Sequence, residues 1–347
     1  MSHKSSSLSR RQFCGAVVGG AALGLLTTQA ADIPAPIIFP LGALPDSRAR
    51  VIALDPRFQR LMPEAVSIER LQTGSTWSEG PAWNIAGRYF VWSDVPNSRQ
   101  YRWLEEDGHV SVFRHPTGHT NGSTFDFQGR MLCCEQDGHR VVRHEPDASV
   151  TVLASEADGK ALNSPNDIVV HPDGGIWFTD PGYGVKGALP QREATYRIDP
   201  ISGAVERVDA SLAKPNGICF SPDFKRLYVA DTGAPEPKPL VVFDVVDGRR
   251  LARKRPFATI EYNGLVAGPD GQQVDIEGNL WASAGHGPDG VNGVQVFAPD
   301  GTRLGVILLP ETCANVCFGG TARNRLFMPA TSSLYVVTTA TRGAHLS

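Results

Sequence analysis

One short pattern recurs six times from residue 86 onward, and it constrains the fold more than any other feature of the chain. A turn residue precedes a short apolar run in AGRYFVWSD, QGRMLCCEQ, DGGIWFTDP, FKRLYVADT, EGNLWASAG and RNRLFMPAT. The turn residues lie 42, 45, 51, 53 and 46 residues apart; they are Gly87, Gly129, Gly174, Lys225, Gly278 and Asn324. This spacing is typical of one four-stranded blade per repeat. The sequence therefore predicts an all-β fold, a six-bladed β-propeller.

Within a repeat, a first strand such as DIVVHPD or GICFSPD turns at PDG-like residues into the second strand, which is a hairpin signal. Outer strands are weaker, as in ATYRIDP and LVVFDVV, and the last repeat ends with SLYVVTT. Residues 67–71 precede the first repeat and could supply the missing strand of the last one. We expect an N-terminal arm over 32–65, with a short helical stretch in DPRFQRLM, and one propeller domain over 66–347.

The first thirty-one residues have the features of an export signal. SRRQF at residues 9–13 precedes an apolar, Gly/Ala-rich run over 15–26, and small residues follow it. This arrangement predicts a twin-arginine signal peptide over 1–31 and a periplasmic protein. A retained membrane anchor is the alternative, which the short and mildly hydrophobic run supports less well. We therefore expect no stable membrane insertion after cleavage.

The charge is mild, with a formal net charge of -3 at pH 7. Removing residues 1–31 would remove Lys4, Arg10 and Arg11 and no acidic residue, which changes the net charge from -3 to -6. Nothing in this balance resembles a surface that binds nucleic acid. The expected partner is a small molecule, and the oligomeric state is not predicted.

Five cysteines follow the signal region: Cys133, Cys134, Cys219, Cys313 and Cys317. The number is odd, no CxxC pair is present, and each lies in an apolar stretch such as ICF or VCF. Buried free thiols are expected. A disulfide between Cys313 and Cys317 is the alternative, because disulfides persist in the periplasm.

The first strand of every repeat begins with an oxygen-bearing side chain, eight or nine residues before the turn residue. These residues are Glu79, Asn121, Asn166, Asn216, Asp270 and Asn315. In a propeller the first strands line the central channel, so equivalent positions converge on one axis. Asn, Asp and Gly also occur in ordinary turns, but six such residues in phase are harder to explain in that way. The pattern predicts a ring of oxygen ligands.

Such a ring suits a hard divalent cation, because calcium takes six to eight oxygen ligands from carboxylates, amides and water. Glu79 and Asp270 would supply charge, and Asn166 and Asn216 neutral oxygen. No cluster of His and Cys stands at matching positions, which argues against zinc or copper. Calcium is the expected cofactor, with magnesium, manganese and, less well matched, zinc as alternatives.

A second layer of polar residues is expected where each second strand ends. It consists of Asp94, Glu135, Asp180, Asp231, His286 and Thr331. Asp180, in FTDPGYG, is the candidate for touching the ligand or orienting a metal-binding group. Tyr183 could cover the pocket. Glu135 and Asp231 are expected to be solvated turn residues.

At these residues the chain resembles the gluconolactonase and regucalcin family of six-bladed propellers. The motifs SEGPAW, SPNDIVVHPDGGIWFTDPGYG, KPNGICFSPD and GPDGQQVDIEGNLWASAG follow the family's signatures in order, and the resemblance runs from about Ile68 to the end. It implies metal ligands at Glu79, Asn216 and Asp270. It also implies that Asn166, with Asp167 beside it, contacts substrate near the metal, and that Asn121 joins it.

The chain departs from the family pattern at two places. His286, in GHGPDG, stands where many relatives have only small residues, and Gln136 and Asp137 follow Glu135 in place of the more usual pattern. Both departures indicate a substrate pocket different from that of a hydrolase for a glucose-derived lactone.

The expected activity is metal-dependent hydrolysis of a sugar lactone, glucono-1,5-lactone or a related aldonolactone, with Asp270 acting on water. His119, His139 and His286 are alternative bases. A propeller esterase or phosphotriesterase and a non-catalytic periplasmic sugar-binding propeller remain open as alternatives. A serine hydrolase is disfavoured because the chain has no GxSxG motif between a strand and a helix. A glycosidase using Glu79 and Asp270 is disfavoured because a bound cation would occupy both.

Overall fold

The computed structural model describes residues 37–38 and 48–345 of the chain. Their structure is built almost wholly from β-strands, with two short 3-10 helices, η1 (Pro56–Leu61) and η2 (Val95–Asn97). The all-β class is therefore confirmed. The predicted signal peptide over 1–31 lies outside the described residues. None of the helices seen in the described part is long and apolar enough to cross a membrane.

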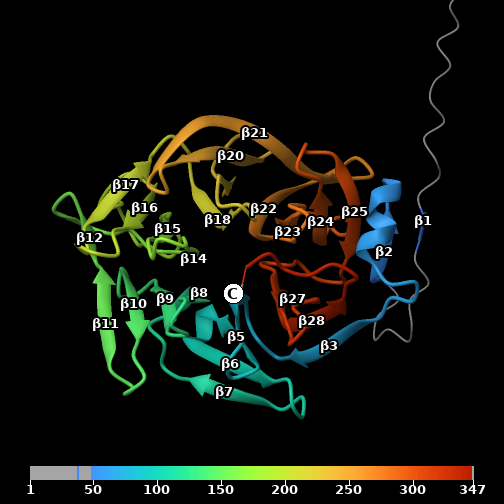
Figure 1. The fold of residues 1–347 in the computed structure, drawn as a ribbon, viewed down its shortest axis with the longest axis horizontal. Coiled ribbons are helices and arrows are strands. Elements are labelled where there is room, and N and C mark those ends of the chain that lie inside the picture. Colours follow the sequence, from blue (N-terminus) through green and yellow to red (C-terminus); the bar gives the residue numbers. More distant parts are fainter. Residues whose placement is uncertain (1–36, 39–47, 346–347) are drawn as a thin grey trace, which may run out of the picture. The chain divides into compact units, whose positions relative to one another are not determined.

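The repeats form antiparallel four-stranded groups that surround a common centre (Figure 1). The first comprises β4 (Ser78–Asn84), β5 (Tyr89–Asp94), β6 (Arg99–Leu104) and β7 (Val110–Arg114). The second comprises β8 (Thr120–Phe125), β9 (Met131–Glu135), β10 (Arg140–His144) and β11 (Val150–Ala154). The third comprises β14 (Ile168–Val170), β15 (Ile176–Asp180), β16 (Ala194–Ile198) and β17 (Val205–Asp209). Between the second and third groups lies a small hairpin of β12 (Glu156–Ala157) and β13 (Lys160–Ala161).

The fourth and fifth repeats belong to one ten-stranded sheet. The fourth repeat supplies β18 (Pro215–Phe220), β19 (Arg226–Asp231), β20 (Pro239–Val246) and β21 (Arg250–Tyr262). The fifth repeat supplies β22 (Leu265–Val274), β23 (Leu280–His286), β24 (Gly293–Phe297) and β25 (Arg303–Leu308). A short hairpin between β21 and β22 joins the two groups, and β1 (Ile37–Ile38) and β2 (Arg50–Ala53) extend the sheet beyond β25.

The last group combines the two ends of the repeat array. It contains β26 (Cys317–Gly319), β27 (Arg325–Pro329), β28 (Ser333–Thr338) and β3 (Ile68–Thr73). β3 pairs antiparallel with β28, from Ile68 opposite Val337 to Thr73 opposite Ser333. The prediction that residues 67–71 complete the last repeat is confirmed. This pairing ties the start of the array to its end.

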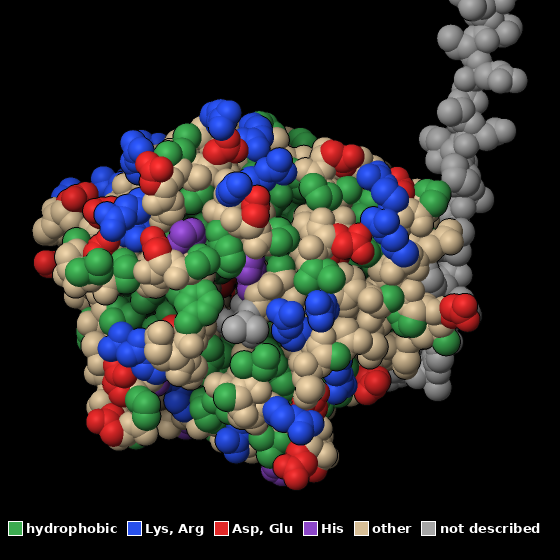
Figure 2. All heavy atoms as spheres, viewed as in Figure 1, with side chains coloured by type: hydrophobic (Ala, Val, Ile, Leu, Met, Phe, Trp, Pro, Cys, Tyr) green, Lys and Arg blue, Asp and Glu red, His purple; other side chains and the backbone are tan. Residues whose placement is uncertain are grey.

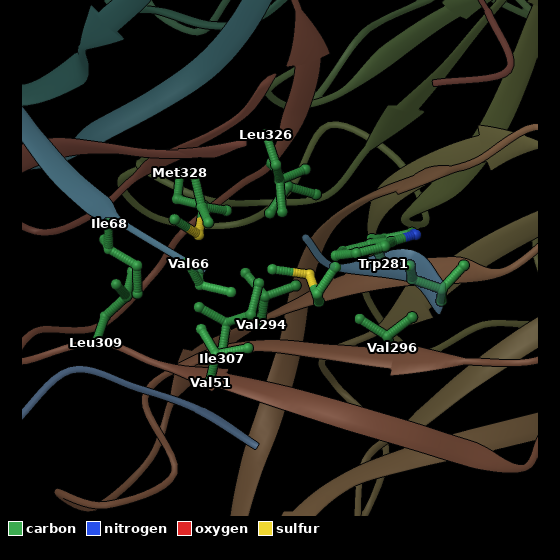
Figure 3. Close-up of a cluster of buried hydrophobic side chains, with 14 of the residues drawn as sticks. Val51, Val66, Ile68, Trp281, Val294, Val296, Ile307, Leu309, Leu326 and Met328 are labelled. Atoms are coloured by element: carbon green, nitrogen blue, oxygen red, sulfur yellow. The ribbon is translucent and has the colours of Figure 1, made fainter. Parts of the chain in front are cut away.

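A hydrophobic core joins the N-terminal segment to the fifth and sixth repeats (Figure 3). Val51 and Ile68 are almost fully buried, and they lie in one cluster with Trp281, Ile307 and Met328. η1 is the predicted helical stretch; its N-cap, Asp55, accepts a hydrogen bond from the backbone of Arg57. Burial of this apolar surface fixes where the array closes.

The five cysteines of the described residues are buried and unpaired, as expected. The disulfide between Cys313 and Cys317, left open as an alternative, is not formed in the structure. Burial raises the pKa of Cys317 to about 12, so its thiol stays protonated.

One strand carries a concentration of positive charge, although the net charge of the chain is mild. Five Lys and Arg side chains fall within residues 249–255, around the start of β21. In Figure 2, Lys and Arg side chains gather along the rim where β20 and β21 lie. Carboxylates neutralise much of this charge: Arg253 and Arg255 pair with Asp244, Arg250 pairs with Asp247, and Arg249 lies 3.5 Å from Asp199.

Candidate functional site

Of the six residues predicted to form an oxygen ring, called the central ring below, five stand within two residues of the start of the first strand of their repeat, and Asp270 is the sixth residue of β22. All six are 4–7% exposed: Glu79, Asn121, Asn166, Asn216, Asp270 and Asn315. In four repeats the antiparallel pairing shifts register beside the ring residue, for example between Glu79 and Ala82 and between Pro269 and Gln272. A β-bulge re-aims side chains next to a functional site, and here it lies at the ring position.

Contacts between successive repeats close the central ring. Asn315 donates a hydrogen bond of 3.1 Å to Glu79, across 236 residues of sequence, and Asn216 hydrogen bonds to Asp270. The glycines beside the ring residues permit this close approach. A Cβ on Gly80, whose φ is +54°, would lie 1.6 Å from the backbone oxygen of Asn121. A side chain there is excluded, so glycine is required for the repeats to meet.

Hydroxyl groups on alternate repeats hold the ring backbone in place. Ser93 donates to the carbonyl of Asn121 at 3.1 Å, and Thr179 donates to that of Asn216 at 2.8 Å. Ser283 donates to the carbonyl of Ala314, the residue before Asn315, at 2.8 Å. All three hydroxyl-bearing residues are fully buried. Sequence reasoning missed them, although a Ser or Thr recurs at one position of the second strand in WSD, FTD and ASA.

The second layer of acidic residues supports the loops that lead into the ring. The carboxylate of Asp94 accepts from the backbone N–H groups of Thr76 and Trp77. The carboxylate of Asp231 accepts from the backbone N–H groups of Ala213 and Lys214, with nitrogen-to-oxygen distances of 2.9–3.1 Å. Charge-assisted bonds of this kind fix a loop more firmly than neutral ones. Each carboxylate thus positions a ring residue two or three places along the chain.

Asp180 has the same supporting role in the third repeat. Its two oxygens accept from the backbone N–H groups of Asn163 and Ser164 at 2.8 and 2.7 Å, just before Asn166. The residue is fully buried, so its carboxylate faces the loop and not the opening. Burial raises the pKa of Asp180 to about 7. Of the two roles predicted for Asp180, this geometry fits orienting Asn166 and not direct contact with a ligand.

Two further expectations about the second layer are wrong. Glu135 and Asp231 are each only 6% exposed and are not solvated turn residues. Glu135 accepts a hydrogen bond of 2.7 Å from Arg140. His286 is not the register equivalent of Asp94, because Ala284 pairs with Pro269, directly before Asp270. His286 lies two residues beyond Ala284, opposite Gly268, and stacks on Trp77 with ring centroids 5.3 Å apart.

Two carboxyl groups, those of Glu79 and Asp270, are buried in the central ring, and a third, that of Asp167, is partly buried beside it. Burial raises the pKa of Glu79 to about 7 and that of Asp167 to about 6. Burial, together with the negative charges of Glu79 and Asp167, raises the pKa of Asp270 well above its usual range. None of the ion pairs formed within the described residues involves these three groups. Buried carboxylates without a cationic partner are unstable as anions, and a bound cation would compensate them.

The donor set of the ring fits a hard divalent cation. It offers carboxylate oxygens from Glu79 and Asp270 and amide oxygens from the ring asparagines, the ligand types that calcium prefers. Over residues 48–345, no three His, Cys, Asp or Glu side chains are arranged to hold a metal ion by themselves. Amide oxygens would therefore have to complete the coordination shell.

Asp167 and Tyr183 both lie close to residues of the central ring. Asp167 accepts backbone hydrogen bonds from Ile168 and Ile218 and lines a narrow central channel of about 50 Å³, which runs to His345. Tyr183 hydrogen bonds to Thr232 and Asn216 above the ring. Burial raises the pKa of Tyr183 to about 12, so its phenol stays a proton donor.

A larger cavity of about 690 Å³ lies beside Tyr183 and is lined by residues of the first, second and third repeats. His119 and His139, the alternative bases, line this cavity. The imidazole of each histidine is held by a contact between Nδ1 and a backbone carbonyl. His119 contacts the carbonyl of Val95, and His139 contacts that of Asn163. The structure places neither histidine in contact with a ring residue, while Asp270 belongs to the ring itself.

Comparison with known proteins gives one consistent result. Residues 77–332 match the family described as SMP-30/Gluconolactonase/LRE-like region. A gluconolactonase of Zymomonas mobilis is 30% identical, over 85% of this chain and 87% of its own. The pentonolactonase XacC of Haloferax volcanii is 28% identical, over 77% of this chain and 83% of its own.

Solved structures agree with these relatives. A gluconolactonase of Xanthomonas campestris superposes with a TM-score of 0.76 and 35% identity, covering 86% of this chain and 98% of its own. A calcium-binding regucalcin of Agrobacterium tumefaciens, at 20% identity, shares the fold with a TM-score of 0.65, over 79% of this chain and 94% of its own.

Proposed function

The chain belongs to the SMP-30/Gluconolactonase/LRE-like family, and we propose that it is a six-bladed propeller enzyme that hydrolyses a sugar lactone at its central ring with the help of a divalent cation. One observation carries the site assignment: Glu79 and Asp270 lie buried in a closed ring of amide oxygens, without a basic partner among the described residues. The relatives named for gluconolactone and pentonolactone hydrolysis support the reaction class.

Glu79, Asn166, Asn216 and Asp270 are the residues that would hold the cation. Calcium suits this oxygen donor set best, while magnesium and manganese are harder to accommodate and zinc prefers nitrogen and sulfur ligands. When bound, a cation of this kind polarises a carbonyl oxygen and stabilises the negative charge that develops on it.

The side chains around the ring would perform the remaining tasks. Asn121 and Asp167 would bind and orient the lactone, with Tyr183 and His286 at the mouth. Asp270 would accept a proton from the attacking water as its oxygen bonds to the carbonyl carbon. The bond between that carbon and the ring oxygen then breaks, and the leaving oxygen takes up a proton. Water is consumed, and the product is a hydroxy acid.

A pH-indicator assay tests this proposal directly. Purified protein would be offered D-glucono-1,5-lactone, a pentonolactone, an aryl ester and a phosphotriester, each with EDTA and after readdition of calcium, magnesium, manganese or zinc. We expect cation-dependent acid release from a lactone. Faster cation-dependent turnover of the aryl ester or the phosphotriester would assign the related esterase activity instead. No cation-dependent turnover of any substrate would favour a sugar-binding protein.

The location is proposed from the N-terminal sequence alone. SRRQF at residues 9–13 and the apolar run after it support export to the periplasm by the twin-arginine route. Fractionation of cells that express the full chain should place it in the periplasm. Replacement of Arg10 and Arg11 by Lys should retain it in the cytoplasm, and periplasmic recovery of that variant would contradict the route.

A further inference from the structure

The third repeat carries the longest connection between a second and a third strand. β15 ends at Asp180 and β16 begins at Ala194, so thirteen residues join them. The corresponding connections of the other five repeats have three to seven residues, as the bounds of their strands show. This connection, residues 181–193, stands on the same edge of the molecule as the central ring. It forms one wall of the 690 Å³ cavity, called the side cavity below.

Tyr183 and Ser164 connect the side cavity to the central ring. Tyr183 lines it and also hydrogen bonds to Asn216, a ring residue. Ser164 lines it too, two residues before Asn166. A molecule whose lactone lies at the ring could therefore extend past Tyr183 into the side cavity. Its volume lies in the middle of the range of about 300–1,000 Å³ that is typical of ligand pockets, which exceeds the need of a single sugar ring.

Two histidines of the cavity wall adopt an unfavourable backbone conformation. His119 has a φ of +53° and His139 a φ of +49°, a region that non-glycine residues seldom occupy. Such conformations cluster at ligand-binding sites, where the surrounding structure enforces them. The carbonyl that each Nδ1 contacts requires that nitrogen to donate, which leaves Nε2 for other partners. The Nε2 atom of His119 lies 3.3 Å from the carboxylate of Asp137.

The chemistry of the wall matches a neutral, hydroxyl-rich ligand. Besides the two imidazoles, it offers the amide of Gln136, the carboxylate of Asp137 and the amine of Lys186. The negative charge of Asp137 and the positive charge of Lys186 balance each other. Together the polar groups of the wall supply both hydrogen-bond donors and hydrogen-bond acceptors. Val95, Pro96 and Val185 add apolar surface against which the C–H face of a sugar can pack.

We propose that the side cavity binds a second sugar ring, so that the substrate is the lactone of a disaccharide in which the lactone unit lies at the central ring. This inference rests on the proposed lactonase function and names the class of its substrate. The reaction is otherwise unchanged: one water adds, the lactone ester bond breaks, and the glycosidic bond remains intact.

The experiment compares cellobiono-1,5-lactone with D-glucono-1,5-lactone on the full-length protein loaded with calcium. We expect kcat/KM to be at least about tenfold higher for the disaccharide lactone. Gln136→Ala removes a polar group of the side cavity, and Val185→Trp fills it. Both should lower kcat/KM for the disaccharide lactone by about tenfold and change that for glucono-1,5-lactone less than twofold. Gln128→Ala, on an exposed turn of the same repeat, is the matched control and should change neither.

Calorimetric titration with cellobionate and gluconate gives a readout without turnover. Tighter binding of cellobionate that is lost in Val185→Trp supports the side cavity even if no lactone is hydrolysed, in which case only the lactonase proposal fails. If the wild type hydrolyses glucono-1,5-lactone but does not prefer cellobiono-1,5-lactone, the second sugar site is refuted and the lactonase proposal stands. The second sugar site is also refuted if Gln136→Ala and Val185→Trp lower kcat/KM equally for the two lactones.

Discussion

The two ends of the central channel are built from the same strands and differ in almost every property. At one end, where the first strands begin, the central ring presents carboxylates and amides around Glu79 and Asp270. At the other end, the last described residues cross the channel. His345 contacts the backbone oxygen of Phe220 at 3.1 Å, and the N–H of Ala344 donates to the oxygen of Val274. One end is polar and lies beside a large cavity, and the other is blocked by the chain itself.

The surroundings of the blocked end are mainly apolar. A cavity of about 450 Å³ lies there, lined by Trp83, Ile85, Phe127 and Phe224. Ile85 is 45% exposed and Phe127 is 51% exposed. Tight hairpin turns join the strands at this end, whereas connections of up to thirteen residues join them at the ring end. The repeat thus builds a scaffold at one end and leaves the other free to vary, which is how loops on rigid folds acquire function.

Replacement of Asp270, the proposed general base at the ring end, should have the largest effect on activity. Asp270→Asn keeps the size of the side chain and removes its ability to accept a proton. We expect kcat/KM for the preferred lactone to fall by about 10³-fold, as is typical of a lost general base. Steady-state kinetics measure the loss, and circular dichroism checks the fold. Asp300→Asn, in an exposed turn, should remain within twofold of wild type, and near-native turnover of Asp270→Asn would contradict the assigned role.

Cation binding at the ring end should raise the free energy of unfolding of the folded protein. Calcium at one hundred times its Kd should raise the free energy of unfolding by about 2.7 kcal/mol, because it binds only the folded state. Glu79→Gln should lose most of this gain, while Glu64→Gln, an exposed residue of the N-terminal segment, should keep it. Denaturant titrations with and without calcium measure the difference. No response of the wild type to calcium would argue against a cation at the ring.

The pH dependence of the cation-free protein gives a sharper test of the same carboxyl groups. Burial raises the pKa of Glu79 from an ordinary 4.5 to about 7, so the folded state binds more protons than the unfolded state between these values. In EDTA, stability should therefore be highest below about pH 4.5 and fall as pH rises to 7, by on the order of 1–3 kcal/mol. Urea midpoints across this window measure the fall. Glu79→Gln should reduce this fall in stability. If stability falls with pH as steeply in Glu79→Gln as in the wild type, Glu79 is not the group responsible.

The ring end was the more predictable of the two from the sequence. Periodicity located Glu79, Asn216 and Asp270, because glycine or aspartate follows every ring residue except Asn315 and one repeat length separates them. The hydroxyl groups of Ser93 and Thr179 were missed because their partners lie in the next repeat, which spacing within one repeat does not reveal. The position of His286 was mispredicted because it lies eight residues after Gly278, whereas the second-layer residues of the second to fourth repeats lie six residues after their turn residues. The same count from Gly278 reaches Ala284, which is the register equivalent.

The blocked end was not predicted at all, because its contacts join residues such as His345 and Phe220 that are 125 positions apart and belong to no motif. His119 and His139 were recognised only as alternative bases. Their left-handed backbone and the cavity between them depend on how the second and third repeats pack, and tertiary packing of this kind leaves no periodic signal.

Loosening the blocked end should have the smallest effect on activity. His345→Ala removes the contact with Phe220 and the packing of the imidazole on Phe224, whose ring centroids lie 4.5 Å apart. We expect a loss of about 1 kcal/mol in the free energy of unfolding and less than a twofold change in kcat/KM. His109→Ala, in an exposed turn, serves as the control. The channel between His345 and the ring measures only about 50 Å³ and contains Asp167, so a tenfold loss of turnover in His345→Ala would mean that the two ends are coupled through that carboxylate.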